Sequence, residues 1–321
     1  MSDDIKLKVS LLQMDVAYGD PEQNRHRAEA MIKEALKQRK RPDVLVLPEM
    51  WTTGYDLARI GDIADREGSP TIGWLQEVAG KNRVNIVAGS IADRRTMSSG
   101  IVRNEGARTP DKADECSTIG NFQATGAGEK ESNVDRPQSG AAGTRSSPNK
   151  KEGVFNSSYV INREGEIVAR YDKVHRFRLM EEDRYLSPGR ETVTFKLDDI
   201  PCGVIICYDL RFPEFVRKLA LMGAKILFVP AQWPKPREAH WKLLNIVRAI
   251  ENQFFVVAVN RAGRDKSGDF PGMSLVVDPW GEVLLEGSDK QEVLTTTLDL
   301  SRIDHARQKI TVFEDRRPEL Y

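Results

Sequence analysis

Cysteine and histidine are scarce in this chain of 321 residues. The three cysteines form no CxxC pair, and the four histidines lack the HExxH or mixed Cys/His spacing of a zinc site. Three cysteines cannot all be paired, so a disulfide framework does not fit, whereas a reducing compartment does. We therefore expect a cytoplasmic protein without a bound metal.

An excess of one charge and a long apolar run are also missing. Lysine and arginine together number 48, as do aspartate and glutamate, so the composition does not indicate a nucleic-acid or anionic-membrane partner. No apolar segment approaches the roughly 20 residues that span a bilayer. The first segment, MSDDIKLKVS, has acidic residues where a signal peptide has basic ones, and no apolar segment follows. We therefore expect neither a secreted nor a membrane-spanning protein.

Short apolar strand patterns alternate with helical patterns along most of the chain. Strands are expected at 7–14, 44–47, 85–90, 155–161, 167–171, 192–197, 203–206, 224–230, 255–260, 274–278, 283–286 and 293–298, and helices at about 21–38, 71–81, 213–223 and 240–254. Many strands are apolar on both faces, which predicts an α/β fold with two sheets between outer helices. No linker divides the pattern, so we expect one domain over residues 1–321.

Residues from about 94 to 152 interrupt this pattern. Serine, glycine, threonine, asparagine, lysine and aspartate dominate there, and periodicity is almost absent. Such a segment cannot bury enough apolar surface to offset the entropy of ordering it. We expect a disordered surface insertion between two strands that would otherwise form a hairpin. A partner-binding loop and sequence wrongly retained in the gene remain as alternatives, and Cys116 within it has no assigned role.

Cys207 lies where an apolar run ends and a polar turn begins. The segment 203–214, GVIICYDLRFPE, predicts a strand, a turn and a helix starting near Pro213, as in a βαβ unit. In that position the loop exposes the sulfur, and the helix dipole favours thiolate over thiol. Cys207 is therefore a candidate nucleophile. The alternative is a small buried residue, which is what most cysteines are.

Two charged residues occupy comparable strand ends. Glu49 follows the apolar strand at 44–47, and Lys173 follows the strand at 167–171. Amide hydrolysis by a thiol needs a base to move the thiol proton and a positive group where oxyanion charge develops. Glu49, Lys173 and Cys207 together supply these functions, although each charge could instead be a solvated loop residue.

With these motifs, the chain resembles the nitrilase, or carbon–nitrogen hydrolase, superfamily. The glutamate motif matches LPE ending at Glu49, the lysine motif matches YDKVH around Lys173, and the cysteine motif matches CYDLRFPE from Cys207. RAIEN at 248–252 and DPWG at 278–281 also match. The resemblance implies a four-layer α-β-β-α sandwich that associates through one face into homodimers or larger homo-oligomers.

The resemblance also implies roles for single residues. Glu49 would be the general base and Cys207 the nucleophile, while Lys173 and the backbone N–H of Tyr208 would stabilise the oxyanion. The family's second glutamate lies in the loop after the lysine. Glu182 is assigned to it, with the adjacent Glu181 as the other possibility.

Segments at 51–56, 233–241 and 320–321 are most similar to the omega-amidase branch of this superfamily. That similarity implies hydrolysis of a terminal carboxamide of a small acid, 2-oxoglutaramate or a related omega-amide, through a cysteine thioester and without a cofactor. An N-carbamoyl amidohydrolase, an aliphatic amidase or a nitrilase would use the same residues. A catalytically inactive scaffold that binds a partner through the insertion is an alternative of another class.

Five residues are predicted to contact the substrate, namely Trp51, Tyr55, Tyr208, Arg211 and Trp233. The aromatic residues could equally be ordinary packing residues, and Arg211 could pair locally with Asp209. Arg176 and Arg178 are further candidates for a substrate carboxylate, because guanidinium suits bidentate contacts.

Overall fold

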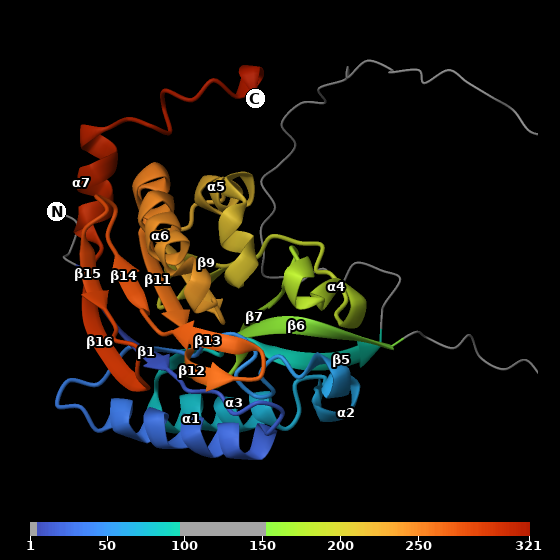
Figure 1. The fold of residues 1–321 in the computed structure, drawn as a ribbon. Coiled ribbons are helices and arrows are strands. Elements are labelled where there is room, and N and C mark those ends of the chain that lie inside the picture. Colours follow the sequence, from blue (N-terminus) through green and yellow to red (C-terminus); the bar gives the residue numbers. More distant parts are fainter. Residues whose placement is uncertain (1–4, 97–151) are drawn as a thin grey trace, which may run out of the picture. The chain divides into compact units, whose positions relative to one another are not determined.

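The computed structural model describes residues 5–96 and 152–321, which belong to one compact unit (Figure 1). Most of the predicted insertion lies outside the described residues. β5 (Ile91–Thr96) and β6 (Glu152–Ile161) lie at its two edges. These two strands pair antiparallel as far as Thr96 and Glu152.

The first sheet has eight strands in the order β16-β1-β2-β4-β6-β5-β3, with β7 beside β6. Besides β5 and β6, its strands are β1 (Lys6–Gln13), β2 (Val44–Val46), β3 (Asp65–Arg66), β4 (Asn85–Val87), β7 (Ile167–Asp172) and β16 (Glu292–Asp299). β1, β2 and β4 run parallel to one another. β2 is apolar throughout and fully buried, because a central parallel strand in such a fold is covered on both faces.

The second sheet has six strands in the order β15-β14-β11-β10-β9-β8, and β12 and β13 form a separate pair. The strands are β8 (Thr194–Leu197), β9 (Ile200–Val204), β10 (Ile226–Ala231), β11 (Phe255–Asn260), β12 (Ala262–Asp265), β13 (Gly268–Pro271), β14 (Leu275–Val277) and β15 (Val283–Glu286). β9, β10 and β11 are parallel, so their carboxyl ends lie at one edge of this sheet.

Helices cover the outer face of each sheet (Figure 1). The α-helices are α1 (Pro21–Leu36), α2 (Ile60–Ile63), α3 (Thr71–Asn82), α4 (Glu182–Tyr185), α5 (Pro213–Leu221), α6 (Glu238–Asn252) and α7 (Ser301–Lys309), and the 3₁₀ turns are η1 (Leu57–Arg59), η2 (Arg178–Met180), η3 (Cys207–Arg211), η4 (Lys235–Arg237) and η5 (Pro318–Leu320). None of the described helices is long and apolar enough to cross a membrane.

The side chains of β1 show how the layers form. Leu7, Val9 and Leu11 point into the core between the two sheets, whereas Leu12 lies in the core beneath α1 and α3. Successive strand residues face opposite sides, so one strand serves both cores. On the other side, Val216 of α5 packs with strands of the second sheet. The predicted four-layer α-β-β-α sandwich is confirmed.

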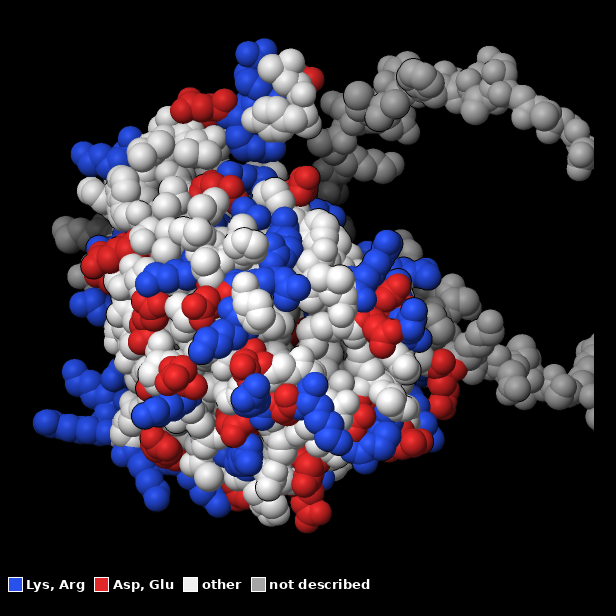
Figure 2. Space-filling model, in the orientation of Figure 1, with Lys and Arg blue, Asp and Glu red and all other residues white. Residues whose placement is uncertain are grey.

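Charge on the surface is mixed in sign. On the face drawn in Figure 2, basic and acidic side chains are interspersed over the helices and the sheet edges. This distribution agrees with the balanced composition of the chain.

The strand predicted at 85–90 ends early, and Gly89 lies in the loop that follows it. β4 ends at Val87, and β5 begins at Ile91. Gly89 has φ +62°, and a Cβ at this position would lie 2.0 Å from the carbonyl oxygen of Pro48. The loop therefore needs glycine, because a side chain would both strain the backbone and push away the segment that leads to Glu49.

Gly89→Ala should lower the free energy of unfolding by more than about 2 kcal/mol, because the left-handed backbone and the contact with Pro48 both oppose a side chain. Urea unfolding measures this change. Gly61→Ala is the matched control, since nothing lies within 4 Å of the Cβ it adds. Equal stability of the two variants would contradict the structural requirement at Gly89.

Candidate active site

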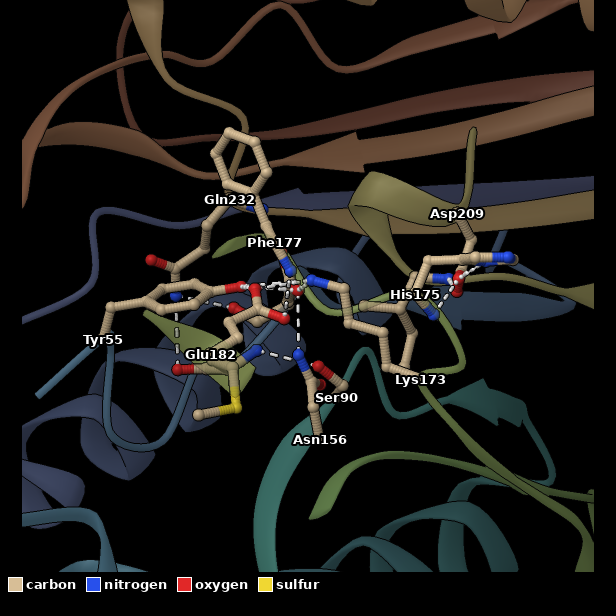
Figure 3. A network of polar contacts seen from close by, with 12 residues as sticks. Tyr55, Ser90, Asn156, Lys173, His175, Phe177, Glu182, Asp209 and Gln232 are labelled. Carbon is tan, nitrogen blue, oxygen red and sulfur yellow. Dashed lines mark hydrogen bonds and ion pairs between the residues drawn. The ribbon is translucent and has the colours of Figure 1, made fainter. Parts of the chain in front are cut away.

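Three strand ends converge on one buried cluster of charged side chains. Glu49 follows β2, Lys173 follows β7, and Cys207 follows β9 as the first residue of η3. Figure 3 shows Lys173 extending toward Tyr55 and Glu182. All these side chains are buried, and Cys207 retains 7% of its surface exposed. The predicted catalytic residues Glu49, Lys173 and Glu182 are thus brought into contact.

Lys173 lies between two carboxylates. Its Nζ is 2.8 Å from Oε1 of Glu49 and 2.7 Å from Oε1 of Glu182. The Tyr55 hydroxyl is 2.7 Å from the same Glu49 oxygen and 2.8 Å from the same Glu182 oxygen. A hydroxyl has one proton, so Tyr55 donates to one carboxylate at a time and connects the two.

The structure distinguishes the two adjacent glutamates after the lysine. Glu182 is buried, and its second oxygen accepts a hydrogen bond of 3.1 Å from the backbone N–H of Phe177. Glu181 is exposed and forms an ion pair with Arg184. Glu182 is therefore the glutamate that reaches Lys173.

Two partners of Glu49 were missed in the sequence. Asn156 donates a hydrogen bond of 2.8 Å from Nδ2 to Oε1 of Glu49, and the backbone N–H of Gln232 donates one of 2.8 Å to Oε2. The side chain of Gln232 also binds the backbone carbonyl of Glu49 at 2.7 Å. Both residues are polar positions in or just after apolar strands, which is the only signal that the sequence offers.

These contacts make the two oxygens of Glu49 unequal. Among the residues that the structure describes, Tyr55, Asn156 and Lys173 donate hydrogen bonds to Oε1, whereas the backbone N–H of Gln232 donates to Oε2. A carboxylate oxygen has about two acceptor sites. Oε2 is therefore the oxygen with a free site to take up a proton.

Asp209 fixes the turn that carries Cys207. Its Oδ2 accepts from the backbone N–H of Ile206 at 3.0 Å and from the Tyr171 hydroxyl at 2.6 Å. Its Oδ1 accepts from the backbone N–H of His175 at 2.9 Å. Asp209 thus ties the cysteine turn to the segment that carries the lysine. The alternative of a local Asp209–Arg211 pair is wrong, because neither oxygen binds Arg211.

The expectation of a favoured thiolate is also wrong for this site. Burial raises the pKa of Cys207, and the charge of Glu49 raises it further although Lys173 opposes this. The helix dipole does not compensate, because η3 separates Cys207 from the start of α5 at Pro213. Cys207 also has φ +47°, a left-handed conformation that costs a non-glycine residue energy.

The two carboxyls differ in pKa. Burial opposes ionisation of Glu49, but the charge of Lys173 and hydrogen bonds from Lys173, Tyr55 and Gln232 outweigh it and lower the pKa of Glu49. Burial raises the pKa of Glu182, despite the opposing charge of Lys173. Burial would lower the pKa of Lys173, but the charges of Glu182 and Glu49 raise it overall. The site therefore holds an ionised base beside a protonated thiol.

The predicted substrate contacts are only partly brought to this cluster. The prediction that Trp51 contacts the substrate is wrong. Its side chain lies in the core beneath α1 and α3 and donates its indole N–H to the carbonyl of Ala88 at 2.8 Å. Tyr55 joins the network itself. Trp233 follows Gln232, and the Arg211 guanidinium lies 4.6 Å from its ring centroid.

The other candidate substrate-binding residues lie in the cysteine turn or in the segment after Lys173. Tyr208 packs against Phe177 at 4.7 Å between ring centroids. The Arg176 guanidinium donates a hydrogen bond of 2.9 Å to the backbone carbonyl of Leu186, so it holds the α4 segment rather than facing the cluster. Arg178 is exposed.

Comparison with known proteins agrees with this arrangement. The carbon-nitrogen hydrolase family model matches residues 8–111 and 138–308. The chain is 39% identical over 317 residues to a 2-oxoglutaramate amidase of Bacillus subtilis, covering 99% of this chain and all of that protein. It is 30% identical to a protein of Staphylococcus aureus described as a hydrolase in the agr operon, covering 98% of this chain and all of that one.

The solved structure of XC1258 from Xanthomonas campestris, described as a CN-hydrolase superfamily protein, is similar with a TM-score of 0.74 and 26% identity, and the match covers 98% of each chain. Because the family model and the full-length relatives span nearly the whole sequence, the chain belongs to the carbon–nitrogen hydrolase family and is an amide-hydrolysing enzyme.

Proposed function

We propose that this enzyme hydrolyses the terminal carboxamide of a short 2-oxo dicarboxylic acid, 2-oxoglutaramate or a close relative, to the acid and ammonia. The observation that carries the reaction is the buried Lys173 held between two carboxylates next to Cys207. The substrate class is supported by full-length similarity to a 2-oxoglutaramate amidase.

Acylation begins with the neutral thiol of Cys207. Glu49 takes the thiol proton, on Oε2, as the sulfur attacks the carbonyl carbon and the C=O electron pair moves to oxygen. The ammonium of Lys173 and the backbone N–H of Tyr208 stabilise that oxyanion. Because burial and Glu49 keep the thiol protonated, proton transfer and attack are coupled.

Release of ammonia completes acylation, and deacylation then returns every group to its starting state. Glu49 gives its proton to the amide nitrogen, the C–N bond breaks, and ammonia leaves a thioester on Cys207. Glu49 then takes a proton from water, whose oxygen attacks the thioester carbon. The C–S bond breaks, the acid leaves, and the sulfur regains its proton from Glu49. Only groups of the protein and water take part in these steps.

Glu182 acts as a positioning residue. It binds Lys173 at 2.7 Å and is itself held by Phe177 and Tyr55. A buried ammonium with two carboxylate partners has little freedom to move, so its charge is fixed before the oxyanion forms.

The remaining predicted residues bind the substrate. Tyr208, Arg211 and Trp233 would surround the acyl chain, and Tyr55 would contribute through the two carboxylates it connects. A guanidinium such as that of Arg211 suits a carboxylate at the far end of the substrate.

The wider context is also a proposal. We infer a cytoplasmic enzyme with a single carbon–nitrogen hydrolase domain, interrupted at about 94–152, that forms a homodimer or larger homo-oligomer. Leu243, Val247 and Ile250 of α6 are exposed, the first at 60%, which supports an apolar subunit contact.

Sedimentation of the intact protein tests the assembly, and a monomer at micromolar concentration would contradict it.

Ammonia release tests the substrate. The purified enzyme should turn over 2-oxoglutaramate in preference to glutamine, an N-carbamoyl amino acid and a simple nitrile, while Cys207→Ala should be inactive because the thioester cannot form. Turnover confined to the N-carbamoyl compound would contradict the proposed substrate. Inactivity on all four would favour the scaffold alternative. Mass spectrometry of a trapped acyl-enzyme on Cys207 checks the intermediate.

Glu49→Gln should separate two effects of the Glu49 charge. Amide turnover should fall about 10²- to 10⁴-fold, because the general base is lost. The pKa of Cys207 should fall toward its ordinary value, because the carboxylate charge that raises it is gone. The pH dependence of iodoacetamide labelling at Cys207, followed by mass spectrometry, measures that pKa.

Cys207→Ala is the control that identifies labelling at other cysteines. If the pKa of Cys207 in Glu49→Gln were unchanged or higher, Glu49 would not be the charge that keeps the thiol protonated.

Glu182→Gln should lower kcat about 100-fold, since Lys173 loses one of the carboxylates that fix its position. Glu181→Gln is the matched control on the neighbouring, exposed residue, and its kcat should stay close to that of the unaltered enzyme. Steady-state kinetics with circular dichroism to verify folding measures both. A similar loss in the two variants would rule out the assignment of Glu182.

A further inference from the structure

Arg237 is a second arginine beside the site, and it was not among the residues predicted to contact the substrate. It is the last residue of η4, in the segment that follows β10 and Gln232. Its guanidinium lies 5.5 Å from the ring centroid of Phe177, whose backbone N–H holds Glu182. Its carbonyl oxygen accepts the indole N–H of Trp233 at 2.8 Å. Arg237 is therefore anchored to two residues of the site's wall.

Arg211 approaches the same place from the cysteine turn. Its guanidinium lies over the ring of Trp233, and its terminal nitrogen is 3.4 Å from Nδ1 of His240. Both arginines are half-buried. Aromatic faces orient a guanidinium while leaving its N–H groups free along the edge. The two side chains are thus oriented by Trp233 and Phe177 rather than by an anion.

Neither Arg211 nor Arg237 has a carboxylate partner among the described residues. The positive charges of the two guanidinium groups repel each other. Burial lowers the pKa of Arg211, and the nearby charge of Arg237 lowers it further, while Tyr208 and Cys207 oppose this change. Two like charges that share a partly buried position are unfavourable unless an anion joins them. A negatively charged ligand between the two guanidinium groups would offset this repulsion.

We propose that Arg237, together with Arg211, binds the carboxylate at the far end of the substrate and so selects amides of acidic compounds over neutral ones. This inference rests on the proposed amidase function of the same site and specifies which substrates it takes. A guanidinium binds a carboxylate through two parallel hydrogen bonds, which fixes orientation as well as charge. The carboxamide would then be directed at Cys207.

The test compares an acidic and a neutral amide of equal length, 2-oxoglutaramate and pentanamide, in the intact enzyme. Arg237→Gln should lower the ratio of their kcat/KM values about 10- to 100-fold, through KM for the acidic amide, because a charged hydrogen bond is lost in both ground and transition states. Arg237→Lys should retain part of the preference, since lysine keeps the charge but not the two-bond geometry.

Arg178→Gln is the matched control. Arg178 is an exposed arginine on η2 and was also a candidate for binding the substrate carboxylate. In this variant the ratio of the kcat/KM values for 2-oxoglutaramate and pentanamide should stay unchanged. If Arg237→Gln lowered kcat/KM equally for both amides, or for neither, the inference would be overturned while the amidase function remained intact. Failure of the unaltered enzyme on both amides would instead count against the proposed function.

A binding measurement gives a readout that does not depend on turnover. In a Cys207→Ala background, 2-oxoglutaramate should bind about 10- to 100-fold more weakly when Arg237→Gln is added. The affinity of the Arg237-containing protein should also fall as salt is raised, because the contact is between charges. Equal affinity with and without Arg237 would overturn the proposal.

Discussion

The ammonium of Lys173, held between the carboxylates of Glu49 and Glu182, is the interaction on which the site depends. Each charge alone would cost several kcal/mol to bury, so each is tolerated because the others are present. The three side chains come from separate segments, and Gln232 at the end of β10 completes the contacts of Glu49. The network therefore requires both sheets to be in place.

This network also sets the state of the nucleophile. Negative charge on Glu49 and removal from water keep Cys207 protonated. A thiol is a poor nucleophile and reacts slowly with oxidants and alkylating agents. In the proposed mechanism the sulfur therefore stays protonated until a carbonyl group is in position, and the charge of Lys173 stabilises the oxyanion rather than a resting thiolate.

Some features of the site could be predicted from the sequence because they are local. Glu49, Lys173 and Cys207 each follow an apolar strand, and the strands themselves come from runs of apolar residues. Trp51 was misplaced because an aromatic residue after a strand can face either the site or the core, and its hydrogen bond to Ala88 depends on a distant segment. Asn156 was missed because its partner is far away in the chain.

The sequence by itself determined the alternation of strands and helices, the α/β class and the family motifs, since periodicity and short motifs are properties of neighbouring residues. Only the tertiary structure decided that Glu182 rather than Glu181 meets Lys173, that Asp209 binds Tyr171 and His175, and that Arg211 and Arg237 both contact Trp233. These outcomes depend on which side chains the packing of two sheets removes from water, and burial of a charge is decided by residues distant in sequence.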